Sequence, residues 1–170
     1  MGVAQTPNTE TSRPRRLEHV TVLVVDDDRH MCKLIKTMLH HMGIKEVRLA
    51  TDAADAFREL KVFPSDLIIS DLRMLPLDGI EFARLVRNAK DIRNHDVPII
   101  MLTGHADMGA VLEALDAGAN DFLAKPISIS RLRGRIERLL FPKGETPPEP
   151  AVADDPGALT QNQIAALLQT

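Results

Sequence analysis

Acidic residues, a hydroxyl and a lysine follow apolar runs at several points of this 170-residue chain. An acidic triplet at residues 26–28 comes directly after the run VTVLVV, and Asp71 follows the run LIIS. Thr103 ends the run VPIIMLT, and Lys125 follows NDFLA. Carboxylates bind hard cations and act as nucleophiles, a hydroxyl donates hydrogen bonds, and an ammonium neutralises negative charge. This set of groups is suited to phosphoryl transfer.

The apolar runs have the length and composition of buried strands, and a helical pattern follows each of them. Apolar content predicts strands over 20–25, 46–50, 66–70, 97–103 and 120–124. Apolar spacing at three and four residues predicts helices over about 31–42, 52–62, 79–88, 107–117 and 128–140. Five β-α units in regular order predict an α/β fold, a doubly wound five-stranded parallel sheet with helices on both faces.

The polar residues that end the strands should meet at one edge of this sheet, where open α/β folds bind ligands. Three carboxylates at that edge would repel one another, and Mg²⁺ would relieve the repulsion because it takes oxygen ligands. Asp71 can then attack a phosphoryl group and form an aspartyl phosphate. Lys125 would neutralise charge on the transferred group, and Thr103 would donate a hydrogen bond to one of its oxygens.

These motifs resemble the receiver domain of two-component response regulators over residues 20–140. The matching fragments are VVDDD, IISDLRM followed by LDG, MLTGHAD and DFLAKPI, in this order and at strand ends. The resemblance implies a flavodoxin-like sheet with strand order 2-1-3-4-5. It also implies Mg²⁺ as the cofactor.

The resemblance assigns roles to the acids at the predicted site. Asp71 is expected to be the phosphoacceptor, and Asp26 and Asp27 to be the acid pair that binds the metal together with Asp71. Arg73 would contribute its backbone carbonyl to the same metal. The phosphoryl group is expected to come from a sensor histidine kinase or a histidine phosphotransfer protein. The chain would then catalyse only its own phosphorylation and dephosphorylation, so we do not expect an enzyme.

A switch is implied by the remaining matches. Thr103 and Lys125 match the hydroxyl and the lysine of the family, and Phe122 falls at its aromatic switch position. A cis peptide is expected between Lys125 and Pro126, as the family usually has. If Thr103 swings toward the phosphoryl group, Phe122 can rotate inward and change the face of the fourth helix, fifth strand and fifth helix, where we expect a downstream protein to bind.

Three alternative functions differ in how well they fit these residues. The chain could be the receiver portion of a longer regulator. It could be an aspartate-nucleophile phosphatase of the haloacid dehalogenase type, but such enzymes place a second acid where this chain has Arg73. A degenerate receiver that only binds partners is disfavoured, because the acid pair, Asp71, Thr103 and Lys125 are all present.

Several residues also have an ordinary structural interpretation. Asp28 is better explained as a residue that favours the start of the first helix than as a metal ligand. Thr103 could be a helix cap, and Phe122 could be plain core. His40 and His41 are adjacent on a helix, point apart and should not form a metal pair.

Charged residues near the site and on the last helix leave further alternatives open. The Arg73 side chain and His105 flank the proposed site, and they could gate attacking water. The last helix is basic, either as a solvated face or as a partner or dimer surface, through Arg131, Arg133, Arg135 and Arg138.

Composition restricts the class of protein. The formal net charge is −3 and the sequence pI is about 6.1, so no global charge favours nucleic acid as a partner. Cys32 is the single cysteine, which excludes an internal disulfide. No apolar run approaches the about 20 residues that span a bilayer. We therefore expect a cytoplasmic protein without nucleic-acid or membrane partners.

The chain divides by composition into four parts. Residues 1–18 are polar and are predicted to be a disordered lead, and residues 19–140 to be the receiver domain. Residues 141–157 contain five prolines and are predicted to be a linker or tail. Residues 158–170 could form a short helix or a frayed tail.

The loop after Asp71 departs from the pattern of the family. Receivers commonly place a proline four residues after the phosphoacceptor, where this chain has Leu75, and Pro76 comes one residue later. Asp78 and Gly79 remain in register. Because proline fixes its own φ and restricts the preceding residue, we predict a locally altered loop beside an intact site.

Overall fold

Strands and helices alternate along the chain in the computed structural model, which describes residues 16–104 and 108–141. The strands are β1 (Thr21–Val25), β2 (Glu46–Ala50), β3 (Leu67–Asp71), β4 (Ile99–Thr103) and β5 (Asp121–Ala124). The helices are α1 (Arg29–His41), α2 (Ala53–Val62), α3 (Gly79–Asn88), α4 (Met108–Asp116) and α5 (Ile129–Leu140). A short 3-10 helix, η1 (Leu17–His19), precedes β1. The five predicted β-α units are confirmed.

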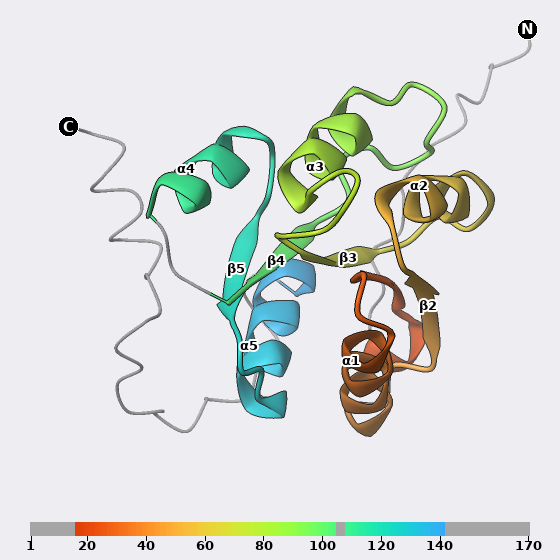
Figure 1. Cartoon of the computed structure of the whole chain (residues 1–170). Helices are drawn as coiled ribbons and strands as arrows, with labels where there is room; N and C mark the ends of the chain where they lie inside the picture. The colour runs from red at the N-terminus through yellow and green to blue at the C-terminus, as the bar shows by residue number, and fades with distance from the viewer. Residues whose placement is uncertain (1–15, 105–107, 142–170) are drawn as a thin grey trace, which may run out of the picture.

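The strands form one parallel sheet in the order β2-β1-β3-β4-β5. Figure 1 shows α1 and α5 on one face of the sheet and α2, α3 and α4 on the other. The doubly wound α/β fold and its strand order are therefore as expected. Parallel strands need a helical crossover between them, and these crossovers cover both faces.

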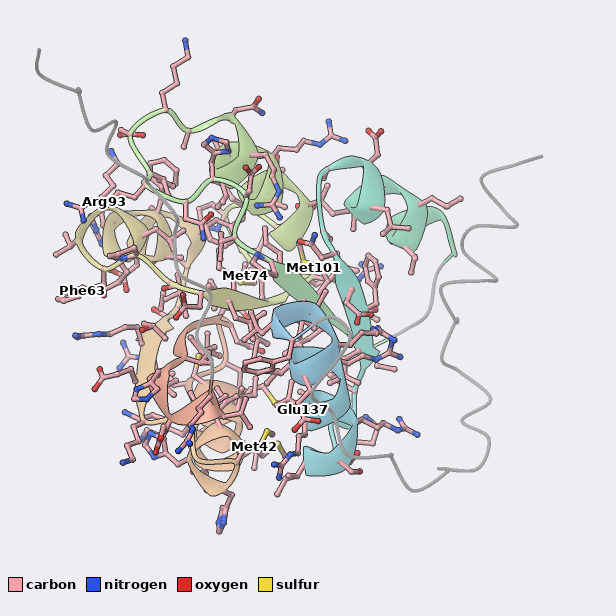
Figure 2. All side chains as sticks on the ribbon, turned by 180° about the vertical axis from the view of Figure 1, so that it is seen from behind. Met42, Phe63, Met74, Arg93, Met101 and Glu137 are labelled. Carbon is pink, nitrogen blue, oxygen red and sulfur yellow. The ribbon has the colours of Figure 1, made fainter. Side chains whose placement is uncertain are left out.

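Successive residues of each strand enter opposite layers of the core. Leu23 and Val25 pack with α2, α3 and α4, whereas Val22 and Val24 pack with α1 and α5. Figure 2 shows side chains filling the space on both sides of the sheet, with Met101 of β4 in the interior. Because β1, β3 and β4 are buried on both faces, they appear in the sequence as nearly continuous apolar runs.

Four helices begin at a residue whose side chain caps the backbone. The Asp28 carboxylate accepts a hydrogen bond from the backbone N–H of His30 at 2.8 Å. Such a cap satisfies one of the free N–H groups in the first helical turn. The interpretation of Asp28 as a helix-start residue is therefore confirmed. The other caps are Asp52, Asp78 and Ser128.

The folded unit extends slightly beyond the predicted domain bounds of 19–140. Leu17, which was assigned to the disordered lead, lies in η1 and packs against the core layer of α1 and α5. Phe141, which was assigned to the linker, packs against the same layer. The remaining predictions for the lead, the linker and the C-terminal helix fall on 1–15 and 142–170, outside the described residues.

Part of the basic face of α5 pairs with acids of the same chain, while Arg133 and Arg138 also remain exposed to solvent, so both predicted alternatives for this face stay open. Arg135 donates to the carboxylate of Asp121 at 3.1 Å, and Arg138 donates to the other oxygen of the same carboxylate. Arg133 pairs with Glu137 at 2.8 Å, one helical turn away. Asp121 is buried, so two arginines compensate a charge that burial alone would make costly.

The helices are short. The longest in the described part of the chain is α1, with 13 residues. A bilayer span takes about 20 residues. Within residues 16–104 and 108–141, none of the helices is long and apolar enough to cross a membrane.

A substitution at Phe82 of α3 tests the core layer between the sheet and α2, α3 and α4. It is fully buried between α3 and the sheet, and its replacement by alanine leaves a cavity. Phe82→Ala should lower the free energy of unfolding by about 3–5 kcal/mol in urea denaturation. Leu85→Ala on the exposed side of the same helix is the matched control, with an expected loss below about 1 kcal/mol. Equal losses would contradict this assignment of the core.

Candidate functional site

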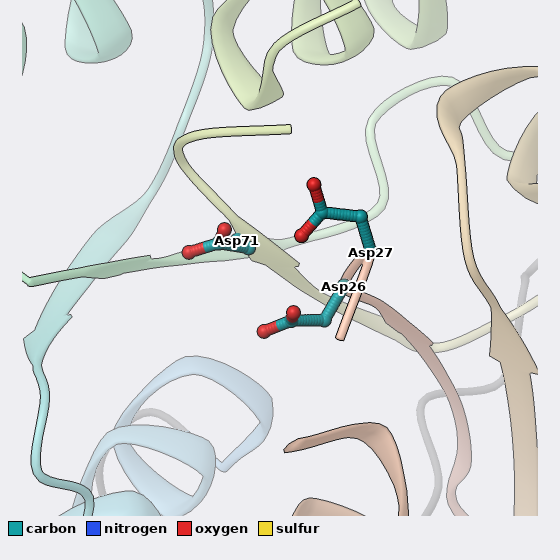
Figure 3. Close-up of side chains that lie close together, drawn as sticks. All are labelled: Asp26, Asp27 and Asp71. Carbon is teal, nitrogen blue, oxygen red and sulfur yellow. The ribbon is translucent and has the colours of Figure 1, made fainter. Parts of the chain in front are cut away.

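The neighbouring strands β1 and β3 carry two buried acids to the same edge of the sheet. Val25 pairs with Ser70 in the register, so Asp26 and Asp71 follow side by side. Asp26 is 1% exposed and Asp71 is 7% exposed. Figure 3 shows their carboxylates extending to the same side, one beside the other. The fold thus holds two acids close together, where solvent can compensate little of their charge.

Asp27 completes a group of three carboxylates. Each of Asp26, Asp27 and Asp71 offers an oxygen, and these oxygens all lie within 4.8 Å of one another. Their donor atoms are the hard oxygens that Mg²⁺ prefers, and their combined negative charge calls for a cation. In the described part of the chain this is the one such group of three. His40 and His41 are exposed on α1 and take no part in it.

Lys125 is the cation that the fold itself supplies at this edge. Its Nζ lies 3.0 Å from Asp71 Oδ1 and 3.2 Å from Asp26 Oδ2, and its side chain is 23% exposed. Its backbone N–H donates to the carbonyl of Thr103 at 2.8 Å, which joins the ends of β5 and β4. The peptide bond between Lys125 and Pro126 is cis, as expected. One ammonium thus bridges two of the three acids.

The charges of the site shift the pKa of both partners. Burial raises the pKa of Asp71 above its ordinary value, the contacts with Lys125 oppose this, and the charges of Asp26 and Asp27 add to it. For Lys125, burial alone would lower the pKa, but the hydrogen bond and charge of Asp71, together with Asp26, outweigh it and raise the pKa. Lys125 is therefore a persistent cation, whereas the negative charge on Asp71 is costly.

Contacts of both its carboxylate oxygens and its backbone carbonyl hold Asp26 in place. Its Oδ1 accepts the backbone N–H of Asp28 at 2.9 Å, while Oδ2 contacts Lys125. The Cys32 thiol lies beneath it and donates to the Asp26 carbonyl at 3.3 Å. Burial, with the charge of Asp26, raises the pKa of Cys32 to about 11. The thiol is therefore an inert packing group, a role that the sequence analysis did not assign.

The loop between β3 and α3 folds back onto Asp71 at Gly79. The Gly79 N–H donates to the carbonyl of Leu72 at 2.9 Å, and a Cβ at Gly79 would lie only 2.4 Å from the Asp71 carbonyl oxygen. Asp78 and Glu81 form a reciprocal capping box that fixes the start of α3. The sequence motif LDG marks this turn, but its close approach to Asp71 is visible only in the structure.

The proline in this loop leaves the acids together. The Leu75–Pro76 peptide is cis, and Leu75 is 81% exposed. Met74 before them is buried in the core layer of α2, α3 and α4. The loop is thus anchored on both sides of Leu75 and Pro76, by Met74 and by Gly79.

The remaining predicted site residues are placed as follows. Thr103 is buried at the end of β4, and α4 begins at Met108, so the alternative of Thr103 as the N-cap of that helix is wrong. Phe122 is half-buried and packs against the layer of α2, α3 and α4. Arg73 is exposed two residues after Asp71, and the metal role of its carbonyl remains a prediction. His105 lies outside the described residues.

Comparison with known proteins points to one family. The response regulator receiver domain family matches residues 22–137. The chain is 36% identical over 121 residues to the response regulator MprA of Mycobacterium ulcerans, covering 71% of the chain and 50% of MprA. It is 32% identical over 123 residues to the transcriptional regulatory protein ZraR of Klebsiella oxytoca, covering 72% of the chain and 27% of ZraR. The chain therefore spans half or less of the length of these curated relatives.

Solved structures with the same fold extend the likeness. The chemotaxis response regulator CheY4 of Vibrio cholerae is 30% identical with a TM-score of 0.65, covering 71% of this chain and 98% of CheY4. A putative response regulator from Chloroflexus aurantiacus is 32% identical with a TM-score of 0.66, covering 71% of this chain and 97% of the other. Nearly the whole of each solved chain matches.

Asp27 and Asp28 are adjacent exposed acids, which makes them a matched pair for testing the cation site. Asp27 belongs to the carboxylate group, whereas Asp28 caps α1. Asp27→Asn should weaken Mg²⁺ binding about tenfold or more, because it removes a unit charge beside a divalent ion. Asp28→Asn should change it much less, since asparagine also caps helices. Titration calorimetry measures both, and equal effects would argue against this site.

The raised pKa of Asp71 makes its ionised form destabilising in the absence of a divalent cation. An acid that holds its proton more tightly in the folded state loses stability as pH rises above the unfolded value of about 3.9. With chelator present at pH 7, Asp71→Asn should raise the free energy of unfolding, because the amide removes a buried charge that lies beside Asp26 and Asp27. The gain should shrink as the pH falls through the raised folded pKa of Asp71 and should be lost below the unfolded pKa of about 3.9. Denaturant melts at several pH values measure this, and an Asn variant less stable at pH 7 would contradict it.

Proposed function

Because the chain belongs to the response regulator receiver domain family, we propose that it accepts a phosphoryl group on Asp71. The donor is the phosphohistidine of a sensor histidine kinase or a histidine phosphotransfer protein. The observation that carries the proposal is the position of Asp71 at a strand end, 3.0 Å from the Lys125 ammonium and within a group of three acids. A nucleophile, a counter-charge and a cation site are thus present together.

In the transfer step a carboxylate oxygen of Asp71 attacks phosphorus while the bond from phosphorus to the donor's imidazole nitrogen breaks. The electron pair of that bond leaves with the imidazole. Lys125 already contacts Asp71, so it is in place to neutralise charge on the phosphoryl oxygens. Mg²⁺, when bound by Asp26, Asp27, Asp71 and the Arg73 carbonyl, would supply further positive charge there.

The residues of the site also limit the reaction to this chain's own modification. Attack of water on the aspartyl phosphate would release inorganic phosphate and restore Asp71. A second acid for turnover of phosphoesters would be expected two residues after Asp71, but that position holds the exposed Arg73. We therefore propose a signalling phosphoacceptor rather than an enzyme with an external substrate.

The signal would pass from Asp71 through Thr103 and Phe122. A phosphoryl group adds about 1.5 to 2 negative charges and new acceptor oxygens beside Thr103. Movement of that hydroxyl vacates space for the half-buried Phe122, which has no hydroxyl to leave unpaired. The face formed by α4, β5 and α5 would then change shape and bind a downstream protein.

Residues 22–137 carry this proposed activity, whether the chain acts alone or as the receiver portion of a longer regulator. MprA is named a response regulator and ZraR a transcriptional regulatory protein, and this chain covers 50% and 27% of their lengths.

Incubation with acetyl phosphate and Mg²⁺ tests the phosphoacceptor. Intact mass should show one phosphoryl group per chain, and Asp71→Asn should abolish it because the amide is not a nucleophile of this kind. Asp52→Asn is the matched control, since Asp52 follows β2 and caps α2, and it should be labelled normally. Labelling that persists in Asp71→Asn would refute the assignment. Rapid release of phosphate from p-nitrophenyl phosphate would favour a phosphatase instead.

A further inference from the structure

Arg87 of α3 joins three segments at the edge of the sheet opposite the acids. Its Nε and Nη2 donate to the Gly118 carbonyl at 3.1 and 2.7 Å. Its Nη1 donates to the His95 carbonyl at 2.6 Å, and Nη2 also donates to Asn120 Oδ1 at 2.9 Å. One half-buried guanidinium therefore ties α3 to the α3–β4 loop and to the α4–β5 loop.

The carbonyl that accepts two of these bonds belongs to the turn that ends α4. Gly118 has φ of 101°, its N–H donates to Leu115, and the Ala119 N–H donates to Ala114, both at 2.9 Å. This is a Schellman arrangement, which needs glycine in the left-handed region. A Cβ at Gly118 would also lie 2.8 Å from Arg87 Cγ and Nε. The turn and the arginine are therefore fitted to each other.

Arg87 acts on α4 as a cap supplied by another helix. The C-terminal end of a helix carries partial negative charge, which a cation stabilises. Burial lowers the pKa of Arg87, but a guanidinium stays charged in proteins. Its hydrogen-bond acceptors in the described part of the chain are neutral oxygens, and two of the four bonds go to the Gly118 carbonyl at this helix end. The carboxylate of Asp96 is a further charge that acts on the guanidinium.

Asn120 extends the connection to the strands that carry the switch residues. Its Oδ1 accepts two hydrogen bonds of 2.9 Å, one from Arg87 Nη2 and one from the Ile99 backbone N–H. Its own backbone N–H donates to the Ile99 carbonyl at 2.9 Å. Ile99 begins β4, which ends in Thr103, and Phe122 lies two residues after Asn120. The start of both strands is thus fixed relative to α3.

We propose that Arg87 is a positioning residue for the phosphorylation switch, which holds the C-terminal end of α4 on α3. Thr103 lies toward the other end of that helix, five residues before Met108. If α4 is held at its C-terminal end, a conformational change at Thr103 and Phe122 displaces its N-terminal end. The inference rests on the proposed function, because it concerns how phosphorylation of Asp71 displaces α4.

Hydrogen exchange with and without acetyl phosphate and Mg²⁺ tests this role. In the unsubstituted protein, phosphorylation should change exchange at residues 108–112 and leave residues 115–120 protected. In Arg87→Met, exchange at 115–120 should rise about tenfold or more before phosphorylation, because hydrogen bonds to a charged group are lost. The phosphorylation-dependent change should then spread to 115–120. Arg87→Lys should restore part of the wild-type pattern, since it keeps a cation at the helix end.

Arg84→Met is the matched control. Arg84 also reaches from α3 to α4, where it lies 3.7 Å from Glu113, but this pair is exposed and should contribute little. It should therefore show the wild-type pattern. Gly118→Ala disturbs the same contact from the α4 side and should behave like Arg87→Met, which keeps the test open if one variant folds poorly.

Two results would overturn the role of Arg87. One is a wild-type response to phosphorylation that is as large at 115–120 as at 108–112. The other is unchanged exchange at 115–120 in both Arg87→Met and Gly118→Ala. Intact mass of the same samples reports labelling of Asp71 separately. Absence of labelling in the unsubstituted protein would refute the proposed function itself, and the switch role with it.

Discussion

Repulsion among three carboxylates, balanced by one lysine, is the constraint on which this site depends. Asp26, Asp27 and Asp71 bring oxygens within 4.8 Å of one another, and Lys125 contacts two of them. An arrangement of this kind is costly in isolation, because like charges oppose one another where water is scarce. It persists because β1 and β3 are fixed by their neighbours on both sides. The net negative charge that remains favours a further cation at this edge.

The two edges of the sheet differ in how fully their polar and charged groups are paired. At the carboxyl ends of the strands, side chains are left with charge that is only partly compensated. At the opposite edge, Arg87 and Asn120 bond to backbone groups of two loops and of the first residue of β4, and Arg87 connects α3 with the end of α4. Under the proposed function, attachment at one edge and uncompensated charge at the other would let a local change of charge move a helix.

The face formed by α4, β5 and α5 contains a buried acid that links α5 to β5. Asp121 accepts Arg135 and Arg138 from α5, and its Oδ1 also accepts the backbone N–H of Phe122 at 2.8 Å. The arginines of α5 are thus connected to the strand residue at the expected switch position. Part of the positive charge that the sequence places on α5 is thus paired with an acid of the same chain.

The sequence by itself determined the β-α order, the buried strands, the helix starts and the acids at strand ends. These features depend on local apolar period and on capping residues such as Asp28, so neighbouring residues specify them. The sequence also predicted that the polar strand ends meet at one edge, but only the tertiary structure decided which atoms are in contact, because that depends on where the crossovers place each strand and helix. The bridge from Lys125 to both acids, the approach of Gly79 to Asp71 and the hold of Arg87 on α4 join residues far apart in the chain or on separate elements. No local pattern contains them, since each partner alone resembles an ordinary surface or turn residue.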